Sequence, residues 1–197
     1  MVMLDAFPEP VYKGKVVPLD SELPYIKTAR ERGDYQNIYG NTTSNDSNVL
    51  NNLPELKSSV QSHLDRYLRE VIGASGVELR VTQSWMNFND YDTSHHTHIH
   101  VNSIVSGVVY LSPNPPPLIL FRKQDGYPIR PMISKMTKYN SPSMKIDVQQ
   151  WDIVLFPSQM PHGVDRNPTN QTRISLAFNT FYKGVLGSEK NLTHLEL

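Results

Sequence analysis

Four of the seven histidines in this 197-residue chain lie within six positions, in the segment Ser94-His95-His96-Thr97-His98-Ile99-His100. Alternate side chains of a β-strand share one face, so His96, His98 and His100 would point the same way, with neighbouring members about 6.7 Å apart along the backbone. Two imidazoles at this spacing can reach one metal ion. An exposed polar strand face or an adventitious metal-binding tract would show the same pattern, but packing imidazoles side by side has no structural benefit. The spacing therefore favours a metal site.

The absence of cysteine excludes disulfides, thiolate metal sites and thiol nucleophiles. Any metal bound by the chain must therefore be held by nitrogen and oxygen atoms. A further histidine, His162, follows an apolar run and a proline-bounded turn in residues 151–161. This order predicts that His162 begins the next strand.

Arg173 lies eleven residues after His162, in a run with strand alternation. One face of that strand would carry Arg173, Ser175, Ala177 and Asn179, and the other Ile174, Leu176 and Phe178. An arginine on a central strand needs an anion close to it. The anion is either a protein carboxylate, such as Asp152 or Asp165, or the carboxylate of a ligand. The nearby His162 and Ser175 favour a ligand.

One helix and many short strands must position these residues. The helix is marked by Asn52 as its cap, Pro54 in its first turn and Gly73 at its end. His63 lies outside the apolar stripe of this helix, so we expect its side chain to be exposed. The first 50 residues indicate short extended pieces and loops. The expected strands span residues 77–88, 97–101, 104–111, 118–122, 143–148, 153–156 and 172–182. Many strands without helices between them predict a mainly β fold, an antiparallel sandwich or barrel with the helix on an outer face.

We expect a single domain over residues 1–197. It divides into an N-terminal extension with the supporting helix (1–76), a catalytic core (77–183) and a C-terminal tail (184–197). Nineteen basic and 19 acidic residues give zero net charge, which argues against a general nucleic-acid or anionic-membrane surface. With no apolar run near the length of a membrane span and no secretion pattern at the N-terminus, we expect a cytoplasmic protein.

Five motifs carry a family resemblance: His98-Ile99-His100, Ser106-Gly107-Val108-Val109-Tyr110-Leu111, Phe156-Pro157-Ser158, His162-Gly163-Val164 and Arg173-Ile174-Ser175-Leu176-Ala177-Phe178-Asn179. In this order they resemble the iron(II)- and 2-oxoglutarate-dependent oxygenases. The nearest match is the group of small 2OG-Fe(II) oxygenases of marine bacteria and their phages. The resemblance covers about residues 77 to 183.

The resemblance implies a double-stranded β-helix, a jelly-roll or cupin-like barrel with Fe(II) in its mouth. Three residues would hold the iron and form the catalytic centre: His98, His100 and His162. Four residues would contact the co-substrate 2-oxoglutarate: Arg173, Ser175, Tyr110 and Asn87. The arginine would clamp the far carboxylate of this co-substrate through its planar fork.

His100 occupies a position where most of the superfamily has aspartate or glutamate. The ligand pair could instead be His96 and His98, with His100 behind them. Three-histidine iron sites also occur in dioxygenases on a related barrel that do not use 2-oxoglutarate. Two further alternatives are a cupin-like barrel whose metal only organises a ligand, and a zinc hydrolase. Arg173 favours the 2-oxoglutarate enzyme, because neither a cupin-like barrel nor a zinc hydrolase needs a buried cation beside the metal.

The implied activity is oxidation of a C–H bond with O2, most often a hydroxylation, with release of succinate and CO2. For the primary substrate we expect a protein side chain or a small metabolite, since zero net charge argues against DNA. The oligomeric state is left open. The basic segment between Phe121 and Ser143 interrupts the barrel and is either a lid over the substrate or a solvated loop. The resemblance places the protein in a bacterial or phage-infected cell.

Overall fold

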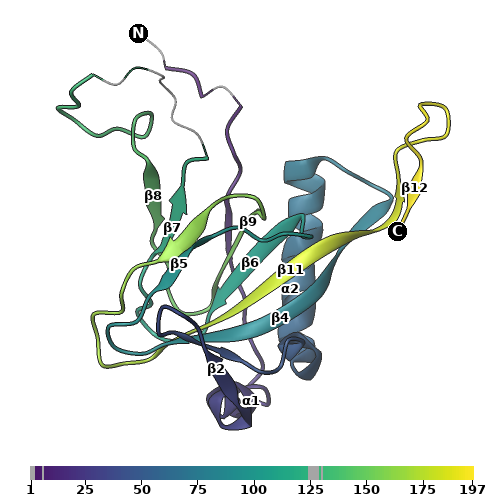
Figure 1. Cartoon of the computed structure of the whole chain (residues 1–197). Coiled ribbons are helices and arrows are strands. Elements are labelled where there is room, and N and C mark those ends of the chain that lie inside the picture. The colour runs from purple at the N-terminus through teal and green to yellow at the C-terminus, as the bar shows by residue number, and fades with distance from the viewer. Residues whose placement is uncertain (1–2, 6, 124–128, 130) are drawn as a thin grey trace.

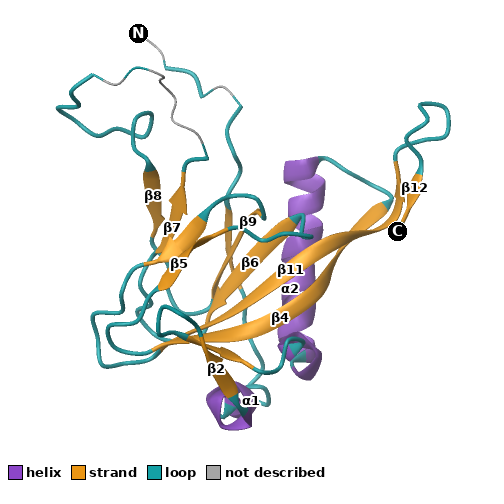
Figure 2. Ribbon diagram, viewed as in Figure 1, coloured by secondary structure: helices purple, strands orange, loops and turns teal. Residues whose placement is uncertain are grey.

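The computed structural model describes residues 3–5, 7–123, 129 and 131–197, which form two antiparallel sheets and one long helix (Figure 1; Figure 2). The eight-stranded sheet has the order β1-β9-β6-β11-β4-β3-β2, with β12 paired to the far end of β11. Its strands are β1 (Tyr12–Lys15), β2 (Asp34–Gln36), β3 (Thr42–Ser44), β4 (Val77–Asn89), β6 (Val105–Tyr110), β9 (Asp152–Pro157), β11 (Arg173–Leu186) and β12 (Leu195–Glu196). The four-stranded sheet, in the order β5-β10-β7-β8, consists of β5 (His95–His98), β10 (His162–Val164), β7 (Leu118–Phe121) and β8 (Ser143–Ile146). The prediction of a mainly β, double-stranded β-helix fold is confirmed.

All the described helical elements precede β4 in the sequence. They are α1 (Leu23–Lys27), the 3-10 turns η1 (Ala29–Arg32) and η2 (Val49–Asn52), α2 (Pro54–Tyr67) and its π-helical continuation η3 (Leu68–Ile72). Of the residues that the structure describes, no helix is both long and apolar enough to cross a bilayer. In the segment before residue 50, the strands β1, β2 and β3 correspond to the expected short extended pieces, whereas the helical elements α1 and η1 were not predicted.

The large sheet has two different faces because its strands alternate. On one face Leu176 and Phe178 of β11 pack with α2 in an apolar core that also contains residues of β4, β6 and β9. On the other face Ala177 packs toward the small sheet, against Leu118 and Leu120 of β7. The predicted two faces of the segment after Arg173 are confirmed, and the polar face looks into the space between the sheets.

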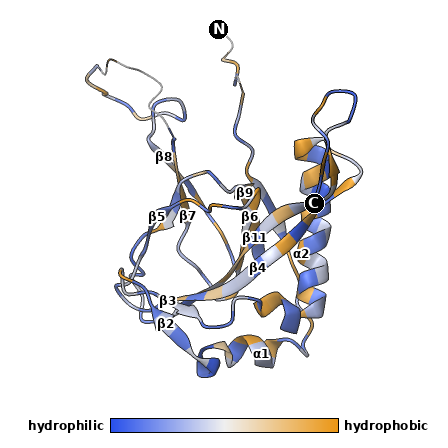
Figure 3. Cartoon of the chain, turned by 45° about the vertical axis from the view of Figure 1, so that its right-hand side comes forward, coloured by the Kyte–Doolittle hydropathy of each residue, from blue (hydrophilic) through white to orange (hydrophobic). Residues whose placement is uncertain are grey.

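The amphipathic helix α2 covers the outer face of the large sheet (Figure 3). The apolar stripe predicted from the sequence is buried except at its last member, Val71, which is 39% exposed. Gly73 ends the helix with a left-handed φ of 72°. The predicted cap was wrong, because Asn52 makes no capping hydrogen bond. The Glu22 carboxylate from the neighbouring α1 segment instead accepts hydrogen bonds from the backbone N–H groups of Glu55 (2.9 Å) and Leu56 (3.2 Å).

His63 was predicted to be an exposed helix residue and is instead partly buried against β1. Its Nδ1 lies 2.6 Å from the Tyr12 hydroxyl, and its Nε2 lies 2.9 Å from the carbonyl oxygen of Lys15. These two contacts attach α2 to the edge strand of the large sheet.

Candidate metal centre

Three histidines meet at the open end of the small sheet. His98 on β5 lies directly opposite His162 on β10 in the antiparallel register. His100 follows β5, and its position is fixed by a backbone hydrogen bond from its N–H to the carbonyl oxygen of Ser158 (2.9 Å). Each of the three rings offers a nitrogen atom, and these nitrogens all lie within 4.8 Å of one another.

Backbone carbonyls set the tautomers of two of these rings. His98 Nδ1 lies 2.8 Å from the carbonyl oxygen of His96, and His162 Nδ1 lies 2.9 Å from that of Met160. A carbonyl oxygen only accepts, so both Nδ1 atoms carry the hydrogen and both Nε2 atoms present a lone pair. His162 Nε2 lies 3.2 Å from His100 Nε2, close to the ~3 Å expected between two nitrogens bound at a right angle to one metal. The donor set fits a divalent transition metal.

Burial keeps these imidazoles neutral. Desolvation, followed by the positive charges that neighbouring histidines would carry, lowers the pKa of His162 to about 3 and that of His100 to about 4. Burial also lowers the pKa of His98. Neutral imidazoles bind a metal without first releasing a proton, so the site is ready to bind a metal at pH 7.

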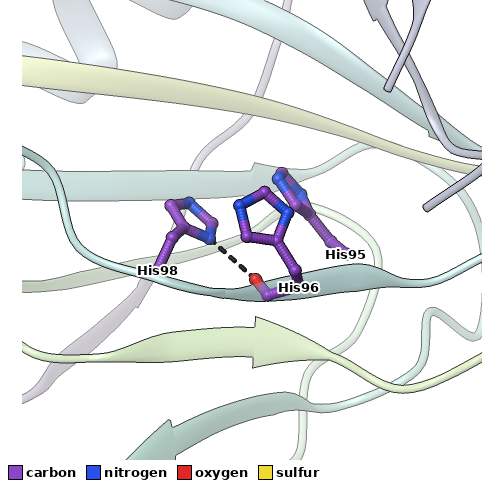
Figure 4. A group of neighbouring side chains, drawn as sticks. All are labelled: His95, His96 and His98. Carbon is purple, nitrogen blue, oxygen red and sulfur yellow. Dashed lines mark hydrogen bonds between the residues drawn. The ribbon is translucent and has the colours of Figure 1, made fainter. Parts of the chain in front are cut away.

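The strand that carries the histidines is bulged, which the sequence analysis did not anticipate. β5 spans His95–His98 rather than residues 97–101, and His100 lies beyond its end. Three steps along β5 oppose two steps along β10, from the His162–His98 pair to the Val164–His95 pair. The extra residue breaks the simple alternation of faces. It brings ring nitrogens of His95, His96 and His98 within 4.8 Å of one another as well (Figure 4).

Arg173 is buried at the start of β11, only 4% exposed. Its Nη1 donates to Asn89 Oδ1 and to Ser175 Oγ, both at 3.1 Å. The two protein carboxylates considered from the sequence are occupied elsewhere: Asp152 pairs with Lys13 and Lys15, and Asp165 pairs with Lys145. Within the described residues, Arg173 therefore takes part in no salt bridge.

Tyr110 lies beside this guanidinium. The strand register places Ser175 next to Tyr110 on β6 and next to Asn87 on β4, and Arg173 Cζ lies 5.4 Å from the centre of the Tyr110 ring. Burial raises the pKa of Tyr110 to about 12, so its hydroxyl remains a donor. Among the described residues, the Tyr110 hydroxyl and Arg173 Nε are buried without a hydrogen-bond partner. Two unpaired donors beside a buried cation suit an anionic ligand, because a carboxylate would satisfy both.

Asn87 is positioned from outside the barrel. Its Oδ1 accepts a hydrogen bond from Thr43 on β3 (2.9 Å), whose hydroxyl in turn accepts from Asn37 (2.8 Å). This leaves the amide NH2 group of Asn87 as the donor on the pocket side. The N-terminal segment therefore reaches the site.

One pocket joins the histidines to the arginine. It is a narrow, partly open pocket, and its lining includes His98, His100, His162, Arg173, Ser175 and Asn87. The metal-type donors come from the small sheet and the following turn, whereas the anion-type donors come from the large sheet. Tyr110 is fully buried behind the pocket wall.

Trp85 and Asn89 belong to the site but were missed by the sequence analysis. The Trp85 ring stacks on His100 with the ring centres 5.7 Å apart, and Asn89 accepts from Arg173. Both alternate with Asn87 along β4. Because Asn87 was already a candidate, a step of two residues in either direction would have found them.

The loop proposed as a lid connects β7 to β8. Its residues 124–128 and 130 lie outside the described residues. Its flanks are joined to the N-terminal segment by two exposed ion pairs of 2.9 Å, Lys123–Glu9 and Lys138–Asp5. Exposed pairs of this kind contribute little stability, so they hold the flanks of the loop only weakly.

Comparison with known proteins gives a family and a fold. Residues 83–179 match the model of a family described as "Putative 2OG-Fe(II) oxygenase". No curated protein sequence matches the chain. Similar solved structures include HygX from Streptomyces hygroscopicus with nickel, 2-oxoglutarate and hygromycin B bound, which has 14% identity, a TM-score of 0.56, and coverage of 88% of this chain and 82% of that one.

Two hydroxylase structures are also similar. A prolyl-4-hydroxylase from Pseudomonas putida has 12% identity and a TM-score of 0.57, covering 87% of this chain and 92% of that one. A prolyl hydroxylase from Trichoplax adhaerens, in complex with a hypoxia inducible factor peptide fragment, has 16% identity and a TM-score of 0.60, covering 87% and 83%. At these identities the similarity establishes the fold.

Proposed function

The chain is an enzyme of the 2OG-Fe(II) oxygenase family, and we propose that it is a hydroxylase that oxidises a C–H bond with O2 while 2-oxoglutarate is converted to succinate and CO2. The observation that supports the proposal is the shared pocket. His98, His100 and His162 line it together with Arg173 and Ser175, so metal-type and carboxylate-type donors face one space.

His98, His100 and His162 would hold Fe(II) through their ring nitrogens. When bound, Fe(II) and 2-oxoglutarate together supply the activation of O2 and the electrons that this family uses for oxidation. Three neutral imidazoles do not offset the 2+ charge of a metal as a protein carboxylate would. A three-histidine site should therefore attract an anionic chelating co-substrate more strongly than a site with one carboxylate.

Arg173 would bind the far carboxylate of 2-oxoglutarate. Ser175 and Asn89 hold one arm of its guanidinium in place, which leaves the other arm and Nε for the ligand. The Tyr110 hydroxyl would donate to the same carboxylate, and the Asn87 NH2 group would contact the co-substrate from β4. Burial of these groups excludes water, which strengthens each charge-assisted hydrogen bond.

For the primary substrate we propose a protein side chain or a small metabolite. Two similar structures are named as prolyl hydroxylases, and a third contains hygromycin B. Zero net charge gives the surface no general attraction for nucleic acid.

The test of the site is the visible charge-transfer band expected when Fe(II) and 2-oxoglutarate are added under anaerobic conditions. The wild-type protein should develop the band, whereas His98→Ala, His100→Ala and His162→Ala should not. His194→Ala is the matched control, because this exposed histidine is next to Glu189 near the C-terminus. A normal band in both His98→Ala and His162→Ala would refute the ligand set, and loss in His96→Ala but not in His100→Ala would move the pair to His96 and His98.

The test of the chemistry is succinate formation without a primary substrate. Oxygenases of this kind slowly decarboxylate 2-oxoglutarate when uncoupled, so the iron-loaded protein should produce succinate in air. The zinc-loaded protein should not, because zinc has no redox chemistry. Metal binding with no 2-oxoglutarate binding would instead support a cupin-like barrel or a three-histidine dioxygenase that uses another substrate.

A further inference from the structure

Five histidines, rather than three, lie close together at this end of the small sheet, and His98 lies at their centre. Its ring centre is 4.6 Å from that of His95, 5.0 Å from His96, 5.0 Å from His100 and 4.4 Å from His162. The proposed function uses His98, His100 and His162. It gives no role to His95 and His96, which the bulge of β5 turns toward the same centre (Figure 4).

Hydrogen bonds within the described part of the chain do not explain the placement of these two additional histidines. In the part of the chain that the structure describes, His95 makes no side-chain hydrogen bond, and His96 Nδ1 is buried without a partner. His96 is held on its other side by the Tyr39 ring, stacked at 4.9 Å with 25° between the planes. An unpaired buried nitrogen such as His96 Nδ1 costs stability unless a ligand satisfies it.

We propose that His95, His96 and His98 form a second binding site for a divalent transition metal of the zinc, nickel or copper type. Each residue offers one ring nitrogen, and the three nitrogens lie within 4.8 Å of one another. Imidazole is a good ligand for all three of these metals. The site is partly exposed, so coordination by water can complete the shell.

The second site and the iron site exclude each other because they share His98. The His98 Nδ1–H donates to the carbonyl oxygen of His96, which leaves a single lone pair, on Nε2. One lone pair serves one metal at a time. To bridge two metals, the ring would have to lose its remaining proton and break a 2.8 Å hydrogen bond. The chain should therefore bind one tight metal ion in either of two places.

The consequence is a choice between metals. Nickel, copper and zinc bind nitrogen ligands more tightly than iron does. An ion held by His95, His96 and His98 takes His98 away from the oxygenase site without itself occupying the iron position. Nickel, copper and zinc can therefore inhibit the enzyme in two ways: by replacing iron in its own site, and by binding at the second site and removing His98.

Zinc titration by calorimetry tests the proposal with matched variants. The His100→Ala/His162→Ala variant lacks two of the three ligands of the oxygenase site and should still bind one equivalent of zinc. The His95→Ala/His96→Ala variant keeps the oxygenase site and should also bind one. Wild type should bind one equivalent rather than two, and the fourfold variant should bind none. His63→Ala/His194→Ala should behave as wild type, because both residues lie away from the cluster.

Three results would overturn the proposal: no zinc binding by folded His100→Ala/His162→Ala, two tight equivalents in wild type, or equal binding by the fourfold variant. Circular dichroism checks that each variant is folded, and asparagine replacements take the place of alanine in any variant that is not. The outcome is separate from the proposed function, because the His95→Ala/His96→Ala variant reports on the oxygenase site alone. Failure of that variant to bind metal would count against the oxygenase site, not the second one.

Discussion

Arg173 is a buried cation whose hydrogen bonds within the described structure go to neutral side chains. Replacing it with alanine should weaken 2-oxoglutarate binding about 10- to 100-fold, since a charge-assisted contact contributes ~1.5–3 kcal/mol. Metal affinity should change little, because the guanidinium is not part of the histidine cluster. Arg173→Lys should recover only part of the binding, as an ammonium group cannot make the planar two-point contact. Calorimetric titration of the metal-loaded protein with 2-oxoglutarate measures these effects.

Arg166→Ala is the control for this variant. Arg166 is an exposed arginine that pairs with Asp92, so its loss should not affect co-substrate binding. If Arg173 served only the fold, Arg173→Ala would lower the melting temperature strongly and leave 2-oxoglutarate affinity normal in the folded fraction.

Removing the hydroxyl of Tyr110 should affect protein stability and co-substrate affinity in different directions. It is buried without a partner among the described residues, so Tyr110→Phe should leave the melting temperature of the ligand-free protein unchanged or raise it. The same change should weaken the binding of 2-oxoglutarate about 2- to 10-fold, because one ordinary hydrogen bond contributes about that much to affinity. Melting curves with and without metal and 2-oxoglutarate measure both effects.

Tyr67→Phe is the matched change on α2, behind the other face of the large sheet, and should not affect co-substrate binding. A Tyr110→Phe protein that is destabilised without ligand, yet binds 2-oxoglutarate normally, would show that the hydroxyl serves the fold.

The buried histidines should make the metal-free protein sensitive to acid. Burial lowers the pKa of His95 and His162 to about 3 from an ordinary value of 6.5. Between these values the unfolded chain binds more protons than the folded one, so stability falls as pH drops below about 6.5 and is unaffected above it. At pH 5 the loss is at most about 2 kcal/mol for each such histidine.

Thermal unfolding from pH 8 to pH 5 without metal checks this prediction. The decline should be smaller in His162→Asn, which removes one titrating group, and bound metal should oppose it by competing with protons. A melting temperature that does not change over this range would mean that the histidines are not buried as the structure has them.

At the scale of elements, the N-terminus of α2 is capped from a distance. The carboxylate of Glu22, 5% exposed, accepts from Glu55 and Leu56 and carries its charge where the helix dipole favours it. Glu22→Ala should cost roughly 1–2 kcal/mol, or about 2–8 °C in melting temperature for a chain of this size. Denaturant unfolding gives the free energy directly, and the exposed Glu31→Ala should be close to neutral. A neutral Glu22→Ala would mean that water caps the helix equally well.

Glu22 also shows where prediction from sequence ends. The period-two pattern after Arg173 was enough to assign both faces of β11, because it depends only on neighbours in the chain. Asn52 looked like a cap for the same local reason, yet the actual cap is a carboxylate 33 residues before Glu55. Only tertiary packing brings α1 to that helix end.

The bulge in β5 is the second case. The alternation rule predicted His96, His98 and His100 on one face of a strand, and His98 and His100 do lie in one histidine cluster. The rule could not place His95 together with His96 and His98, because a bulge is defined by the partner strand β10 and not by β5 itself. The face on which a residue of one strand lies can be predicted from the sequence. Which side chains of that strand come into contact depends also on how the strand pairs with its neighbour.

At the scale of the whole molecule, the site extends beyond the segment shared with the family. The family match covers residues 83–179, whereas Thr43 positions Asn87 and Tyr39 stacks on His96. None of the described N-terminal residues lines the pocket itself, but this part of the chain holds Asn87 and His96 in place from behind and also packs against the large sheet. The family match spans the histidines and the arginine but not these supporting residues.

The division of the pocket between the two sheets has a consequence for internal motion. A metal ion alone would join β5 to β10 and the following turn, all on one side of the barrel. A dicarboxylate held at both ends would connect that side to β11 and act as a crosslink between the layers. Amide hydrogen exchange should then slow in two stages, first in β5 and β10 with a redox-inert metal, and then at the start of β11 and along β4 when 2-oxoglutarate is added. Protection confined to the small sheet in the ternary complex would show that the co-substrate leaves the two layers free to separate.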